Sequence, residues 1–146
     1  MTRESNPAEA VQKIALQDVT PNRRRGGDIR VLLSPKTVGS STGFMGILTL
    51  APGEYVSEHY HPYSEEFLYA VRGTVEARVE DKKLAVGAGE GIMIPKGLRH
   101  RVTNTGVDTA VLVFHLCPLA PRPELGHVDT EALPHPDAVG PEVGGR

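Results

Sequence analysis

The chain of 146 residues has little cysteine, because Cys117 is its single one. One cysteine excludes an internal disulfide framework and any zinc or iron–sulfur site built from several thiolates. No apolar segment approaches membrane-spanning length, and the N-terminus carries Arg3 and Glu4 without a signal-peptide h-region. We therefore expect a cytoplasmic protein that does not bind a membrane.

A large excess of charge of either sign is also absent. The net charge is −2 and the isoelectric point is about 6.3. No global electrostatic attraction to nucleic acid follows from these values, so a nucleic-acid partner is not expected.

Glycine and proline, in contrast, are abundant, with 16 and 12 residues. Both disfavour helices, which argues against a helical bundle. A hydrophobic content of 39% with 23% charged residues is typical of a globular chain. The length suits one domain. Composition therefore predicts a single all-β domain with many turns.

The chain divides into three predicted parts: an arm over residues 1–20, a barrel with a C-terminal extension over 21–131, and a flexible tail over 132–146. Within the middle part, short apolar runs alternate with turn signals about every ten residues, which is typical of a β-sandwich or barrel. The runs cover residues 29–33, 44–50, 67–71, 74–79, 91–94, 100–103 and 110–116.

Histidines gather where metal ligands would be needed. His59 and His61 are two apart, so in a strand both point to the same face. Pro62 ends that strand, and a next strand returning antiparallel beside it could bring a carboxylate, from Glu65 or Glu66, to the same point. His100, on a further neighbouring strand, would complete a set of nitrogen and oxygen ligands.

The spacing of these residues resembles the two motifs of the cupin family. The first group is Gly53-x5-His59-x-His61-x4-Glu66-x6-Gly73, and the second is Gly89-x5-Pro95-x-Gly97-x2-His100-x3-Asn104. The resemblance implies a double-sheet jelly-roll barrel, also called a double-stranded β-helix, of six to eight strands with its site inside.

The same resemblance implies one divalent metal ion. The family's four usual ligands fall on His59, His61, Glu66 and His100, while Glu65 fits a shorter form of the motif. Zinc is the first expectation, with nickel, iron and manganese as alternatives, since ligand type does not name the ion.

His115 leaves the fourth ligand open. It lies in a run that is apolar on both sides, residues 111–116, and is expected to be buried. It is either a hydrogen-bonded core histidine or a fourth imidazole ligand, in which case Glu66 would move to proton transfer. His127 and His135 lie in the proline-rich C-terminal stretch and are expected at the surface.

Three segments outside the general motifs, residues 21–35, 59–67 and 113–131, resemble the single-domain cupin cyclases of aromatic polyketide pathways, a group that includes the tetracenomycin and resistomycin cyclases. The resemblance implies aldol-type ring closure and dehydration of a poly-β-keto chain, with Glu66 as the candidate base. The substrate could be presented by an acyl carrier protein.

Strand parity predicts which side chains line the substrate cavity. Residues on the same strand face as a ligand, or as His115, should point inward with it. The substrate-binding candidates are Tyr55, Ser57, Leu68, Ala70, Val102 and Val113.

Two other functions are compatible with the same pattern: a metal-dependent cupin dioxygenase and a metabolite-binding auxiliary cupin without catalysis. One barrel serves many chemistries, so the fold does not choose between them. A homodimer is expected, with residues 8–20 and 29–35 adding edge strands to a neighbouring copy.

Overall fold

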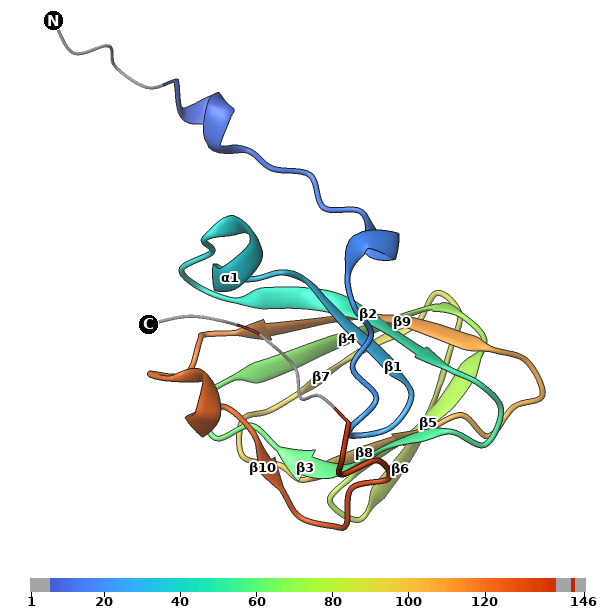
Figure 1. The fold of residues 1–146 in the computed structure, drawn as a ribbon. Helices are drawn as coiled ribbons and strands as arrows, with labels where there is room; N and C mark the ends of the chain where they lie inside the picture. Colours follow the sequence, from blue (N-terminus) through green and yellow to red (C-terminus); the bar gives the residue numbers. More distant parts are fainter. Residues whose placement is uncertain (1–5, 139–142, 144–146) are drawn as a thin grey trace, which may run out of the picture.

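Two five-stranded antiparallel sheets face one another in this computed structural model, which describes residues 6–138 and residue 143. Their strand orders are β1-β2-β9-β4-β7 and β10-β3-β8-β5-β6 (Figure 1). The all-β jelly-roll prediction is confirmed, although the described residues form ten strands instead of six to eight. The strands are β1 Asp28–Leu33, β2 Phe44–Leu50, β3 Tyr55–Tyr60, β4 Glu65–Arg72, β5 Thr74–Val79, β6 Lys82–Gly87, β7 Gly91–Ile94, β8 His100–Thr103, β9 Ala110–Cys117 and β10 Val128–Asp129.

Alternation along the strands builds the core between the sheets. In β9, the side chains of Ala110, Leu112, Phe114 and Leu116 are buried, and the residues between them are not. Because β9 lies between β2 and β4, this row of side chains forms the middle of the core. Burial of such apolar surface is the main contribution that holds the two sheets together.

Most of the predicted runs are strands, but two strands, β6 and β10, were missed and one was placed in the wrong sheet. The charged residues 80–83 signal only a turn, yet Lys82–Gly87 forms β6, which pairs with β5 across a tight turn in which Glu80 has a φ of 52°. The strand after Pro62 was expected beside β3. It is instead β4, in the opposite sheet, where it pairs with β7 and β9.

The two ends of the chain behave differently. Before the barrel, the arm has two short 3-10 helices, η1 Pro7–Ala10 and η2 Leu16–Asp18, and in Figure 1 it runs away from the barrel. After β9, η3 Pro123–Leu125 leads into β10, which pairs with β3. The predicted flexible tail is described only over 132–138 and at residue 143. There the His135 amide donates a hydrogen bond to the Arg24 carbonyl.

One short α-helix, α1 Pro35–Val38, follows β1 and is capped by Ser34. Within the described residues, no helix has the length and apolar character needed to cross a membrane.

Candidate metal centre

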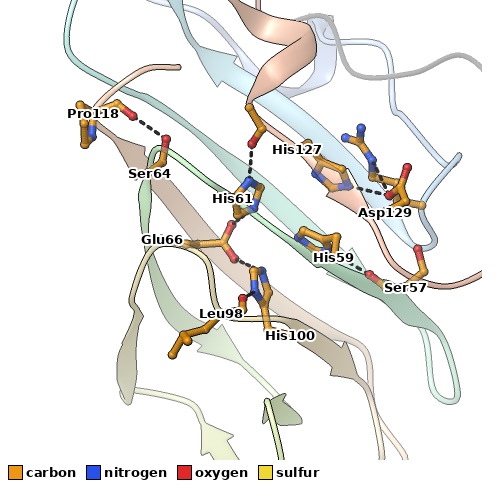
Figure 2. A network of polar contacts seen from close by, with 12 residues as sticks. Ser57, His59, His61, Ser64, Glu66, Leu98, His100, Pro118, His127 and Asp129 are labelled. Carbon is orange, nitrogen blue, oxygen red and sulfur yellow. Dashed lines mark hydrogen bonds and ion pairs between the residues drawn. The ribbon is translucent and has the colours of Figure 1, made fainter. Parts of the chain in front are cut away.

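Three histidines and one glutamate converge inside the barrel (Figure 2). His59, His61, Glu66 and His100 are all buried, and their candidate ligand atoms lie within 4.8 Å of one another. His59 on β3 pairs in register with His100 on β8, so the third imidazole does come from a neighbouring strand. Glu66 belongs to β4 of the opposite sheet and reaches the group from across the barrel, which corrects the expected strand pairing.

Each of the three imidazoles is oriented through its Nδ1 atom. In every case this nitrogen donates a hydrogen bond to a backbone carbonyl, which leaves the lone pair on Nε2. The acceptors and distances are Ser57 O for His59 (2.7 Å), Gly126 O for His61 (2.9 Å) and Leu98 O for His100 (3.0 Å).

Two of the Nε2 atoms in this group lack a hydrogen-bond partner in the part of the chain that the structure describes. Those of His61 and His100 are buried and make no hydrogen bond of good geometry within the described residues. Their charged neighbour is Glu66, whose carboxylate oxygens lie 3.6 Å from His61 Nε2 and 3.2 Å from His100 Nε2. Imidazole nitrogens with one carboxylate oxygen are ligands that zinc and related divalent ions accept. The residues therefore fit the metal ion that the resemblance implied.

The pKa shifts of these residues also favour a bound cation. Burial and the neighbouring His100 hold the pKa of His59 well below its ordinary value. Burial opposes ionisation of Glu66, but its contacts with His100 and His61 outweigh burial and hold its pKa well below the usual range. For His100, burial acts against the charged form, yet the contact with Glu66 raises the pKa overall. An ionised carboxylate among imidazoles favours a positive charge at the centre of the group.

The group opens into a cavity of about 460 Å³. Its volume falls within the range typical of small-molecule sites. Leu68 and Val102 lie in its wall, where strand parity placed them. Other apolar side chains from both sheets complete the wall: Ile29, Val31, Phe44, Leu48, Val56, Phe114 and Leu116.

The prediction that Tyr55 and Ser57 line the cavity is contradicted. A register shift between Val56 and His59 interrupts the pairing of β3 with β8, so alternation from His59 does not carry back along the strand. Val56 takes the place in the cavity wall instead. Tyr55 lies outside the cavity lining with the Arg101 guanidinium 3.9 Å from its ring centroid, and Ser57 is fully buried.

Two further wall candidates are also misplaced. Ala70 faces inward with Glu66 and Leu68, but it is packed in the core and does not reach the cavity. Val113 follows the parity of His115, and that face of β9 is the outer one.

His115 is not part of the metal centre. It is exposed on the outer face of β9, with its ring 5.9 Å from that of Phe67. The expectation of burial was wrong because this face of the sheet is apolar without being covered. The fourth candidate ligand is therefore Glu66.

Sequence reasoning missed His127, which was expected at the surface. Its ring stacks on that of His59 with centroids 4.3 Å apart, and it lines the cavity. Burial is the main cause that lowers the pKa of His127 to about 2. Its Nε2 atom lies 2.7 Å from Asp129 Oδ1 and donates to it. No pattern in the sequence indicates this position, which depends on the pairing of Asp129 in β10 with His59 in β3.

The architecture and these four candidate ligands are those of a cupin. The model of the cupin domain family matches residues 46–116, a stretch that contains all four. Similarity to relatives over most of the chain supports the same assignment, and the chain belongs to the cupin family.

Its relatives place it in a narrower group. Protein SchB of Streptomyces halstedii is 58% identical over 118 residues, which cover 81% of this chain and 86% of that protein. The tetracenomycin polyketide synthase protein TcmJ of Streptomyces glaucescens is 48% identical over 136 residues, covering 93% and 91%. The sequence resemblance to cupins of aromatic polyketide pathways is thereby confirmed.

Solved structures agree in fold. The polyketide cyclase RemF from Streptomyces resistomycificus superposes with a TM-score of 0.65 at 19% identity, covering 86% of this chain and 89% of that one. A predicted oxalate decarboxylase from Thermotoga maritima gives a TM-score of 0.65 at 22% identity, covering 74% and 100%. At these identities the likeness concerns the fold alone, because one barrel serves several chemistries.

Proposed function

We propose that the protein is a metal-dependent cyclase of aromatic polyketide biosynthesis. One observation carries the proposal: three imidazoles and a carboxylate meet at the wall of a largely apolar cavity inside the barrel. The names of TcmJ and of the polyketide synthase CurC from Streptomyces cyaneus, 54% identical over 119 residues, supply the substrate class. That substrate is a poly-β-ketone.

The metal ligands in this proposal are His59, His61, His100 and Glu66. Zinc remains the first expectation, ahead of nickel, iron and manganese. A divalent ion bound there supplies Lewis-acid polarisation of a ketone oxygen, which is worth several kcal/mol in charge stabilisation.

We assign the proton transfer to Glu66 as well, through the carboxylate oxygen that a bound metal ion would leave free. Its carboxylate is ionised, as its lowered pKa indicates, and it lines the cavity, so one of its oxygens can accept a proton from the carbon between two ketones. That carbon then bonds to a ketone carbon further along the chain, while the proton taken up by Glu66 passes to the ketone oxygen and makes it a hydroxyl. The hydroxyl then leaves as water together with a proton from the neighbouring carbon, and the ring aromatises. No oxidant or reductant is required.

The cavity wall directs which carbons meet. Leu68 and Val102 are the wall residues kept from the sequence prediction, and Val56 joins them. Rigid apolar walls hold a folded chain with its reacting carbons close together. The chain therefore loses its conformational entropy when it binds, and this loss no longer adds to the barrier of the ring closure.

The cyclase proposal also implies partners for the protein. An acyl carrier protein would present the chain, and a homodimer and a cytoplasmic location stay predictions. Two features support a dimer: the arm exposes Val11 and Leu16, and the outer face of the β4 sheet exposes Phe67, Tyr69 and Met93. Exposed apolar surface of this kind marks interaction sites.

The proposal is tested by metal analysis of the untagged protein, followed by chelation and add-back in the presence of an enzyme system that makes a poly-β-ketone chain. We expect about one divalent ion per chain, loss of the cyclised product on chelation, and recovery on add-back. Product formation that is unchanged in His59→Ala after metal loss would instead indicate an auxiliary binding protein. Oxygen uptake with an oxidised product would indicate a dioxygenase.

A further inference from the structure

Arg25 is a charged group in the cavity wall that the proposed chemistry does not use. It lines the cavity together with His59 and His127, and its side chain is 20% exposed. Its Nε atom is buried and makes no hydrogen bond within the described part of the chain. A buried guanidinium with an unused donor is costly, so its position calls for an acceptor.

The acidic neighbour of Arg25 satisfies it poorly. Asp129 Oδ1 lies 3.6 Å from Arg25 Nε, which is too long for a hydrogen bond. The same oxygen accepts from His127 Nε2 at 2.7 Å. Asp129 therefore directs its strong hydrogen bond to the imidazole, and the guanidinium retains donors that can face a ligand.

The backbone around Arg25 is fixed against the barrel. The Ser57 amide donates to the Arg25 carbonyl at 2.9 Å. The next residue, Gly26, has a φ of +105°, and a Cβ there would lie 1.8 Å from the Tyr55 carbonyl oxygen. Only glycine tolerates that approach. The backbone that carries the Arg25 side chain is thus closely attached to β3 beside the cavity.

The two carboxylates in the cavity lining, Glu66 and Glu124, do not neutralise the charge of Arg25. Glu66 lies among the ligand imidazoles, and Glu124 forms an exposed ion pair with Arg122 at 3.4 Å. Arg24 adds a second cation to the lining. The rest of the wall is mostly apolar.

We propose that Arg25 binds the carboxylate group of a flat, mostly apolar acid that occupies the cavity. The planar guanidinium fork matches a carboxylate and forms charge-assisted hydrogen bonds with it. This inference rests on the proposed function for the cavity being the ligand site, and it adds an acid group to the ligand's chemistry. The reacting part of such a ligand lies towards the histidines and its acid group towards Arg25.

The test is isothermal titration calorimetry of the full chain, as purified, with 2-naphthoate and its neutral analogue 2-naphthamide. We expect the acid to bind about tenfold or more tightly than the amide, since hydrogen bonds to charged groups are the strong ones. Arg25→Gln should abolish that preference. Binding of the carboxylate to a metal ion cancels between the variants because the four ligand residues are unchanged.

Arg23→Gln is the matched control. It removes the same charge from the same segment, but Arg23 pairs with Asp28 at 3.5 Å and is absent from the cavity lining. We expect it to keep the preference for the acid within about twofold, because an exposed charge is well screened. Equal losses in the Arg23 and Arg25 variants, or no preference in the wild-type chain, would overturn the proposal.

Two further variants protect the test against misfolding. Asp129→Asn keeps an acceptor for His127 but removes the competing negative charge, so it should raise the affinity for naphthoate and leave that for naphthamide unchanged. Arg25→Lys keeps the charge without the planar fork and should retain part of the preference. If Asp129→Asn lowers the affinity for the acid, the proposal is wrong.

The failure of this proposal can be distinguished from the failure of the cyclase proposal. A preference for the acid that depends on Arg25, in a protein that forms no cyclised product, would support the carboxylate site and reject the cyclase. Cyclisation with no preference for the acid would do the reverse.

Discussion

His100 and His115 both lie on central strands of the barrel, yet they have opposite environments. His100 is 1% exposed and faces Glu66 across the interior. His115 lies on the outer face of β9, beside Phe67. The difference teaches that a histidine within an apolar strand is informative only once the buried face of that strand is known.

The reason for the confusion lies in the outer face itself. β9 carries apolar residues on both sides, and its outer neighbours on β4, Phe67 and Tyr69, are 43% and 48% exposed. Two-sided apolar strands normally indicate burial on both faces. Here the inward side chains of β9 form the core, and the outward apolar side chains of β9 and β4 stay exposed, where another protein surface could cover them.

The largest expected effect separates these two histidines directly. His100→Ala removes a buried ligand nitrogen, so metal affinity should fall more than about 100-fold. His115→Ala, the matched control on the outer face, should leave the affinity unchanged. Competition titration against a chelator of known affinity measures both. A similar loss of metal affinity in both variants would contradict the assignment of His100, and not His115, to the metal centre.

Glu66→Gln tests the role of the buried carboxylate in the cyclisation reaction. The amide keeps the size of the side chain but neither carries the negative charge nor accepts a proton, so the rate of cyclisation should fall about 100-fold or more. Glu65→Gln, the neighbouring carboxylate outside the cavity lining, is the control and should react at the normal rate. Product formation over time gives both rates, and a similar loss in both would exclude a specific role for Glu66.

Glu131→Ala tests the C-terminal segment that supports the interior. Glu131 accepts from the Glu58 amide at 2.7 Å and pairs with Arg101, so it ties the end of β10 to β3. Loosening that segment should displace the Gly126 carbonyl from His61 and lower metal affinity by about tenfold. Arg122→Ala, at an exposed ion pair, should have no measurable effect.

The smallest effect on the metal centre is expected from the outer face. Tyr69→Ser should weaken self-association, because it removes half-exposed aromatic surface from the face proposed for dimer contact. Its metal affinity should equal that of the wild type. Light scattering coupled to size-exclusion chromatography measures the mass, and a dimer unchanged by the substitution would assign the contact to the arm instead.

Much of the fold and the metal centre was predictable because both depend on local signals. Turn residues at regular intervals marked the strands, and the spacing of His59, His61 and His100 indicated three of the four candidate ligands that gather inside the barrel. Sheet membership was less accessible: nothing near Glu66 indicates that β4 lies opposite β3.

The remaining errors have identifiable physical causes. A β-bulge after Val56 broke the parity that placed Tyr55 and Ser57 in the cavity. His127 could not be placed, because its position depends on the pairing of β10 with β3, a pairing of only two residues in a proline-rich stretch. Short pairings of this kind leave almost no pattern in the sequence.

The most direct test of the central claim is a crystal structure of the metal-loaded protein with anomalous diffraction at the metal edge. We expect one peak inside the barrel, about 2.0–2.2 Å from the Nε2 atoms of His59, His61 and His100 and from a Glu66 oxygen. A peak at His115, or an interior without one in a protein that holds a stoichiometric metal ion, would contradict it.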